Sequence, residues 1–167
     1  WLAAGIHVVT PNKQAGAGPL ARYGAIREAA AASGARFRYE ATVGAGLPVI
    51  STLRDLLDTG DAVASIEGIF SGTLAWLFNR YDGSVPLSRL VAEARALGYT
   101  EPDPRDDLSG TDVARKLVIL AREAGRDMTL EDVQVESLVP ADLRQASVED
   151  FMARLGEVDA AFAAKLA

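Results

Sequence analysis

The chain has 167 residues, of which 49% are hydrophobic and 24% are charged, as in an ordinary globular domain and unlike a disordered or fibrous chain. Its net charge of −6 argues against nucleic acid or an anionic membrane as the main partner, because both need a basic surface. The absence of cysteine excludes disulfides, zinc thiolates and cysteine nucleophiles, and a lone His7 argues against a histidine triad.

The N-terminal segment indicates a helix end that runs into a short strand at Val8-Val9, which Pro11 and Asn12 then end. A strand this short needs partners, and none lies before it in the sequence. We therefore expect that an N-terminal part is removed or supplied separately. The longest uncharged run, residues 41–53, is shorter than the roughly 20 residues that span a bilayer, and no secretory signal is visible. A cytoplasmic protein is the expectation.

Helices and strands alternate along the rest of the chain. Apolar spacing, glycines and prolines predict helices over residues 20–33, 49–58, 74–81, 86–97 and 111–124, with a helical tail that begins at Ser147 as N-cap. Alternating patterns predict strands over residues 36–42, 62–70 and 133–139. The fold class predicted from this order is α/β (α+β), with a sheet covered by helices.

The densest chemical signal lies between Gly98 and Lys116. Two prolines stiffen residues 101–107, which we interpret as an acidic loop, and Thr111 is a candidate N-cap for the helix after it. The carboxylates of this segment are Glu101, Asp103, Asp106, Asp107 and Asp112.

Three interpretations of this segment stay open from the residues alone. Asp112 and Lys116 are four residues apart, so they share a helix face and suit a surface salt bridge. They equally suit a site in which a lysine donates a proton while carboxylates hold a cationic amine. Clustered carboxylates also bind Mg²⁺ or Ca²⁺, although the spacing of a calcium-binding helix–loop–helix motif is not met.

Lys13 follows the predicted strand end, where open α/β sheets place ligands, and is either a second cationic group at the site or a solvated loop residue.

The G-x-G-x-x-A pattern over residues 16–21 argues weakly for dinucleotide binding, because it does not form the first turn after the strand and Pro19 removes an N–H. Residues 44–46 form a strand-to-helix turn or, beside Glu40, a cation site. Residues 71–73 cap a helix or receive a carboxylate there.

Taken together, four segments resemble the homoserine dehydrogenase family. They are VVTPNK ending at Lys13, YEATVGAGLP ending at Pro48, GIFSGT ending at Thr73 and GYTEPDPRDDLSGTDVARK ending at Lys116. All four occur in the family's order, and the resemblance covers roughly residues 1–143. The segment after Lys116 is similar to the version fused behind an aspartate kinase.

The resemblance implies NAD(P)-dependent interconversion of L-homoserine and L-aspartate 4-semialdehyde, a step toward threonine, methionine and isoleucine. It implies Lys116 as the proton donor and acceptor, with Lys13 as a second catalytic lysine. The residues it implies for substrate are Glu101, Asp107, Asp112, Gly72, Thr73 and Tyr99. Those for the cofactor are Pro11, Asn12, Lys13 and Gly98, and those for a sodium ion are Glu40, Val43, Ala45 and Leu47.

The family's nucleotide-binding βαβ unit, with its glycine-rich turn, has no counterpart in this sequence. The expected organisation is the end of a nucleotide-binding domain at residues 1–15, a substrate-binding and dimerisation domain at residues 16–143, and a helical tail at residues 144–167 that returns toward the nucleotide domain. We expect a homodimer and little or no turnover by this chain alone. The alternative is a non-catalytic dimerisation or regulatory module of the same fold.

Overall fold

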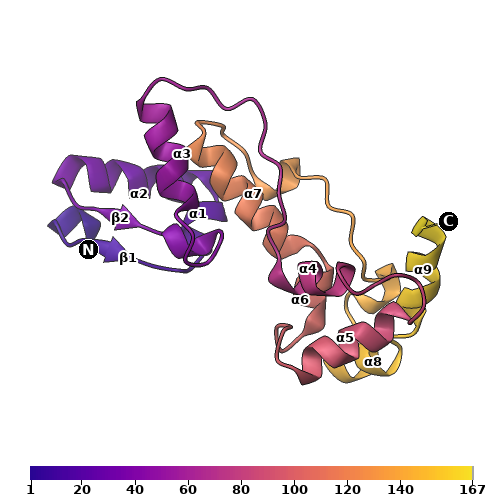
Figure 1. Ribbon diagram of the computed structural model, residues 1–167. Coiled ribbons are helices and arrows are strands. Elements are labelled where there is room, and N and C mark those ends of the chain that lie inside the picture. The colour runs from indigo at the N-terminus through magenta and orange to yellow at the C-terminus, as the bar shows by residue number, and fades with distance from the viewer. Residues whose placement is uncertain (167) are drawn as a thin grey trace. The chain divides into compact units, whose positions relative to one another are not determined.

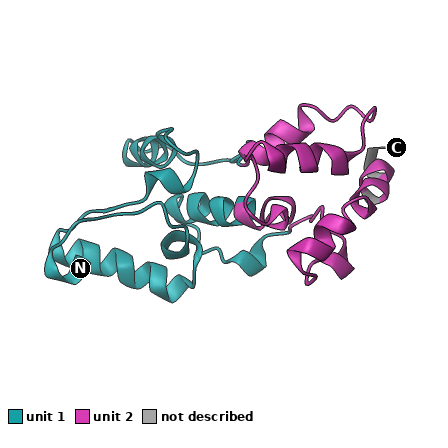
Figure 2. Cartoon of the chain, turned by 90° about the horizontal axis from the view of Figure 1, so that it is seen from below, with its two compact units in different colours: residues 1–70, 113–134 teal, residues 71–112, 135–167 magenta. Residues whose placement is uncertain are grey.

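The computed structural model describes residues 1–166 (Figure 1). It divides into two compact units, and the chain passes between them more than once (Figure 2). Unit 1 comprises Trp1–Phe70 and Val113–Gln134, and unit 2 comprises Ser71–Asp112 and the chain from Val135 onward. One of the passages falls within a single helix, α7 (Thr111–Glu123).

Unit 1 combines a two-stranded parallel sheet with helices. Besides most of α7, unit 1 contains two strands and three helices: β1 (Val8–Val9), β2 (Phe37–Arg38), α1 (Gln14–Ala17), α2 (Leu20–Ser33) and α3 (Val49–Asp58). It also contains the 3-10 turns η1 (Leu2–Ala4), η2 (Glu40–Thr42) and η3 (Leu130–Asp132). Val8 pairs with Phe37 and Val9 with Arg38. The buried core is Ala17, Tyr39, Val43, Ile50, Val118, Ile119 and Leu120. This mixture of helices with a small parallel sheet agrees with the α/β class predicted from the sequence.

The predictions for α2 and α3 are confirmed. The alanine-rich segment of α2 has few branched side chains that would oppose a helix, and it ends at Gly34, whose φ of +70° suits a residue without a Cβ. The strand predicted over residues 36–42 is shorter, because the chain turns into η2 after Tyr39. Glu40 at this turn accepts hydrogen bonds from the first backbone N–H groups of α3, which an extended strand would leave unpaired.

Two further predicted strands are absent from the described residues. Residues 62–70 are irregular throughout, residues 133–139 are irregular apart from bends, and within the described residues β1 and β2 pair only with each other. In these segments apolar residues pack on helices instead: Ile66, Phe70 and Val133 lie against the core of unit 1. Alternation of apolar and polar residues indicates that one side of a segment is buried, but a strand also needs a neighbouring strand for its backbone hydrogen bonds.

Unit 2 is helical around a separate core. Its elements are α4 (Gly72–Phe78), α5 (Leu87–Ala96), α6 (Pro104–Leu108), the 3-10 turn η4 (Ala141–Leu143), α8 (Val148–Ala153) and α9 (Glu157–Leu166). The core is Leu77, Leu87, Leu90, Val91, Ala94, Leu108, Val139, Leu143, Phe151, Leu155 and Val158. Ser147 caps α8 as predicted, since its hydroxyl accepts a hydrogen bond from the Asp150 N–H at 3.0 Å.

The interpretation of residues 101–107 as a loop is wrong, because the segment contains most of the short helix α6. Asp103 caps this helix by accepting a hydrogen bond from the Arg105 N–H, and Pro104 occupies the first turn, where no intrahelical N–H is needed. Thr111 is the first residue of α7 rather than its N-cap. Among the helices of the described residues, none is long and apolar enough to cross a membrane.

Candidate active site

Lys116 lies half-buried in the middle of α7, where apolar residues bury one face of the helix. Ala114, Val118 and Ile119 are in the interior of unit 1. The Lys116 ammonium donates a hydrogen bond to the backbone carbonyl of Phe70 at 2.6 Å. The side chain is therefore fixed in direction by a neutral acceptor. Phe70 was not singled out from the sequence, although it lies inside the GIFSGT motif, because a backbone carbonyl has no residue-type signal.

The segment after β1 carries Lys13 and its neighbours at the carboxyl end of a parallel strand. The Asn12 side chain accepts a hydrogen bond from the Gln14 N–H at 2.8 Å, so it orders the start of α1. Lys13 is the N-cap residue of α1 and is partly buried. Pro11 and Asn12 are exposed. The turn therefore places Lys13 after the carboxyl end of β1, at the sheet edge where α/β folds bind ligands.

In unit 2, the start of α4 is tied to the turn after α5. The Thr73 hydroxyl donates to the Tyr99 carbonyl at 2.6 Å, and the Tyr99 ring lies 5.7 Å from that of Trp76. Gly98 permits the turn with a φ of +74°. Gly72 begins α4 and is exposed, after the buried N-cap Ser71. The structure thus brings together Gly72, Thr73 and Tyr99, three of the residues predicted for substrate.

Glu101 and Asp107 are also brought together in unit 2. The Asp107 carboxylate accepts a hydrogen bond from the Glu101 backbone N–H at 2.8 Å, and Glu101 is an exposed residue. Asp107 therefore positions the Glu101 backbone as well as adding negative charge. Asp112 is in the first turn of α7, one helical turn before Lys116.

Asp103 has a structural partner. Arg105 donates from Nε and Nη2 to its carboxylate at distances of 2.6–3.0 Å, and from Nη1 to the carbonyls of Leu143 and Ala146 at 3.1 and 2.6 Å. These hydrogen bonds hold the Asp103 pKa below its usual value. The pair fixes α6 against the segment that leads to α8.

The acidic segment does not form a metal centre in the described residues. No group of three or more histidine, aspartate or glutamate side chains there is arranged to hold an ion. Asp103 is engaged by Arg105, and Asp107 by a backbone N–H. The interpretation of this segment as a divalent-cation site therefore gains no support from the geometry.

The residues predicted for sodium lie in the loop between β2 and α3. Both Glu40 oxygens accept backbone N–H groups, from Ile50 at 2.6 Å and Ser51 at 3.0 Å. Ala45 adopts φ +53°, in the left-handed region that favours glycine. The Leu47 carbonyl accepts from the Val49 N–H at 2.9 Å. The loop offers a carboxylate and backbone carbonyls, which are the oxygen ligands that hard cations take.

Comparison with known proteins gives consistent matches along the chain. Residues 48–166 match the family model described as homoserine dehydrogenase, and residues 1–40 match the model described as its NAD-binding domain. The maize protein "Bifunctional aspartokinase/homoserine dehydrogenase 2, chloroplastic" is 59% identical over 95% of this chain, which covers 17% of that protein. The homoserine dehydrogenase of Emericella nidulans is 52% identical over 98% of this chain and 48% of its own length.

A solved structure agrees with these sequence matches. The homoserine dehydrogenase of Thiobacillus denitrificans has a TM-score of 0.66 and 35% identity, over 91% of this chain and 34% of that one. The chain spans less than half the length of each of these relatives. The family model alone covers more than half of the chain. This chain belongs to the homoserine dehydrogenase family.

Proposed function

We propose that this chain is the part of a homoserine dehydrogenase that carries the catalytic lysine and the substrate-binding carboxylates. The reaction is the NAD(P)-dependent interconversion of L-homoserine and L-aspartate 4-semialdehyde. The supporting observation is Lys116, an ammonium anchored on a helix and oriented by the Phe70 carbonyl at 2.6 Å. The NAD-binding family model over residues 1–40 supports a nicotinamide cofactor.

The chemistry follows from the charge that develops on the substrate. In the reducing direction, the aldehyde carbon receives a hydride, which is what the bound nicotinamide supplies, and the aldehyde oxygen gains negative charge. The Lys116 ammonium stabilises that charge and gives its proton to the oxygen, so that the product is the alcohol. Lys13 adds positive charge near the same oxygen. The reverse reaction returns the hydroxyl proton to neutral Lys116.

The substrate is an amino acid with an ammonium and a carboxylate to be bound. In this proposal Glu101, Asp107 and Asp112 attract its ammonium group. Gly72 and Thr73, at the start of α4, receive its carboxylate, because the N-terminal N–H groups of a helix favour anions. Tyr99 forms part of the wall. Pro11, Asn12, Lys13 and Gly98 contact the cofactor.

The loop between β2 and α3 is proposed as a sodium site. Glu40 with the carbonyls of Val43, Ala45 and Leu47 offers only oxygen donors, which fits a hard monovalent cation. The ion would stabilise the turn whose Ala45 is strained. It would not take part in hydride or proton transfer.

The organisation beyond the two compact units is also proposed rather than observed. We retain residues 1–15 as the end of a nucleotide-binding domain, residues 16–143 as the substrate and dimerisation region and residues 144–167 as a tail. A homodimer is expected, and sedimentation of the purified protein tests it. The cytoplasmic location stays a prediction, since relatives from plants are described as chloroplastic.

Substitution of Lys116 tests the role of the lysine in a complete enzyme containing this chain. Lys116→Ala should lower kcat for homoserine oxidation by about 10²–10⁴-fold, the usual contribution of a proton-transfer group. Lys116→Arg should lower it similarly, because a guanidinium keeps the charge but does not release its proton near neutral pH. Exposed Arg126→Gln is the control. A kcat for Lys116→Ala within about threefold of the parent enzyme would contradict the proposal.

The complete enzyme also distinguishes catalysis from the non-catalytic alternative. If the chain were a non-catalytic dimerisation module, the complete protein would show no dehydrogenase activity before Lys116→Ala, and the substitution would disrupt the dimer. The isolated chain is expected to oxidise homoserine little or not at all, and cofactor-dependent turnover near that of the complete enzyme would contradict this expectation.

A further inference from the structure

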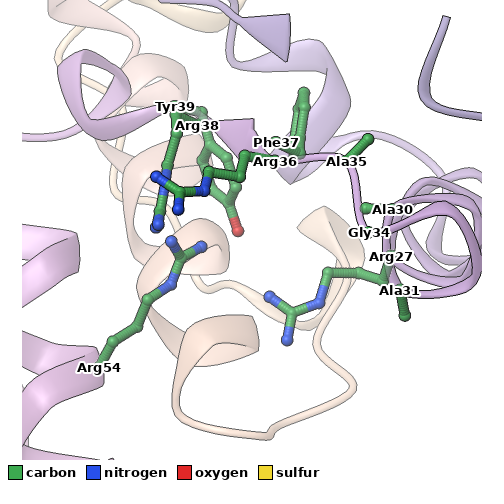
Figure 3. A pocket seen from close by; sticks show the side chains of 10 residues that line it. All are labelled: Arg27, Ala30, Ala31, Gly34, Ala35, Arg36, Phe37, Arg38, Tyr39 and Arg54. Atoms are coloured by element: carbon green, nitrogen blue, oxygen red, sulfur yellow. The ribbon is translucent and has the colours of Figure 1, made fainter. Parts of the chain in front are cut away.

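Four arginines line one pocket of unit 1, and none of the residues assigned to homoserine is among its lining residues. The pocket has a volume of about 350 Å³, and its charged side chains are Arg27, Arg36, Arg38 and Arg54 (Figure 3). They come from α2, from β2 with the residue before it, and from α3. None of the described residues that line this pocket is a carboxylate. In a chain with a net charge of −6, such a concentration of positive charge calls for a physical reason.

A buried carboxylate beneath the pocket compensates part of this charge. Glu123 of α7, whose side chain is only 2% exposed, accepts a hydrogen bond from Arg54 Nε at 2.5 Å and lies 3.6 Å from Arg27 Nη1. The Tyr39 hydroxyl also donates to Glu123. Glu40 and Asp58 attract Arg54 without a hydrogen bond or ion pair to it among the described residues. One contacting carboxylate therefore serves two arginines.

The contacts with Glu123 and Tyr39 fix the Arg54 guanidinium in place. Its carbon lies 5.2 Å from the centre of the Tyr39 ring, and Nε is held by Glu123. Among the described residues, no hydrogen bond engages its two terminal nitrogens. Figure 3 shows Arg27 and Arg54 reaching toward the hydroxyl end of Tyr39 from two sides. A guanidinium held in this way loses little conformational entropy when it binds an anion.

The other two arginines, Arg36 and Arg38, present their charge to solvent. They are two residues apart across β2, so they project from the same side of the extended backbone, opposite to Phe37. Both are exposed, and their guanidinium groups make no hydrogen bond or ion pair within the described part of the chain. The opposite wall is built of Ala30, Ala31 and Gly34, whose small side chains leave room for a ligand.

From these observations we infer that the pocket binds a small ligand through a phosphate or diphosphate group, at a site that shares no lining residue with the one proposed for homoserine. Only one carboxylate contacts these guanidinium groups, which leaves an excess of positive charge that a multivalent oxyanion neutralises. Each planar guanidinium group can donate two parallel hydrogen bonds to two oxygens of the same phosphate. The carboxyl end of α2 also faces this region, but a helix end contributes only about half a negative charge, which the arginines outweigh.

Calorimetric titration of the purified protein with inorganic pyrophosphate tests the inference. Saturable binding of one equivalent is expected, and Arg38→Gln and Arg36→Gln should each weaken it by roughly tenfold, because each removes a charge-assisted hydrogen bond. Both residues are exposed, so the variants should fold. Arg126→Gln removes an exposed arginine of the same unit outside the pocket and is the matched control.

Amide chemical shifts recorded during the titration locate the bound anion. The changes should concentrate between Ala30 and Tyr39. Shifts centred on Lys13, an equal loss of affinity in Arg126→Gln, or no saturable binding would overturn the inference. Citrate, a multivalent anion without phosphorus, is the comparison ligand, and binding of citrate as tight as that of pyrophosphate would overturn the phosphate assignment. Because no Lys116 variant enters the test, its result is independent of the dehydrogenase proposal.

Discussion

The acidic segment of unit 2 and the buried Glu123 of unit 1 show two opposite ways of placing negative charge. The segment from Glu101 to Asp112 is dense in carboxylates, yet its side chains are exposed or only partly buried. Glu123 lies at the end of α7 and its side chain is nearly inaccessible, with two arginines and two tyrosines around it. A cluster of carboxylates in the sequence thus does not indicate which carboxylate is buried and has the largest desolvation cost.

The two regions also differ in what their partners do to the carboxyl groups. Burial raises the pKa of Glu123, and Arg27 opposes that effect only in part. Hydrogen bonds from Arg105 lower the pKa of Asp103. The first carboxylate is constrained by desolvation, whereas the second is stabilised by its partner near water.

The largest expected effect is on stability at Glu123. Glu123→Ala leaves Arg54 and the Tyr39 hydroxyl without their shared acceptor in the interior, and breaking a buried ion pair costs roughly 3–5 kcal/mol. The free energy of unfolding from urea denaturation measures this. Glu123→Gln keeps an acceptor oxygen and should lose less. A loss below about 1 kcal/mol for Glu123→Ala would mean that the cluster contributes little.

A smaller effect is expected at Asp103. Asp103→Ala removes the N-cap of α6 and the partner of Arg105, and should cost about 1 kcal/mol, because the side chain is partly exposed. The same urea measurement applies. Asp106→Asn, at an exposed position of the same helix, is the matched control and should change the unfolding free energy by less than about 0.5 kcal/mol. Equal losses in both variants would contradict the assigned role of Asp103.

The smallest expected effects are opposite pH dependences. Because its folded pKa is raised, Glu123 contributes stability at pH below its unfolded value of about 4.3, and this contribution is lost as pH rises through the folded pKa. Asp103 has a lowered pKa, so its contribution is present above about 3.9 and is lost as pH falls. Carboxyl carbon shifts followed by NMR during titration measure both pKa values. Two shifts in the same direction would invalidate the contrast.

Local sequence patterns predicted much of the helical structure. The alanine-rich α2, the amphipathic α3, α5 and α7, and the Ser147 cap follow from spacing and from side chains that act on neighbouring backbone groups. The strands over residues 62–70 and 133–139 were wrong because strand pairing depends on partners remote in sequence. The α6 helix was missed because the prolines were interpreted only as stiffening a loop, although Pro104 suits the first turn of a helix.

For the candidate site, the sequence by itself determined the family and the residue types, since the long motif ending at Lys116 keeps its order and spacing within one short stretch. Only the tertiary structure decided that the Phe70 carbonyl orients Lys116, that the Asp107 carboxylate holds the Glu101 backbone, and that Glu123 is shared by arginines from α2 and α3. The physical reason is the separation along the chain over which each kind of interaction acts. Propensity and capping act over a few residues, whereas desolvation and ion pairing depend on which distant segments exclude water together.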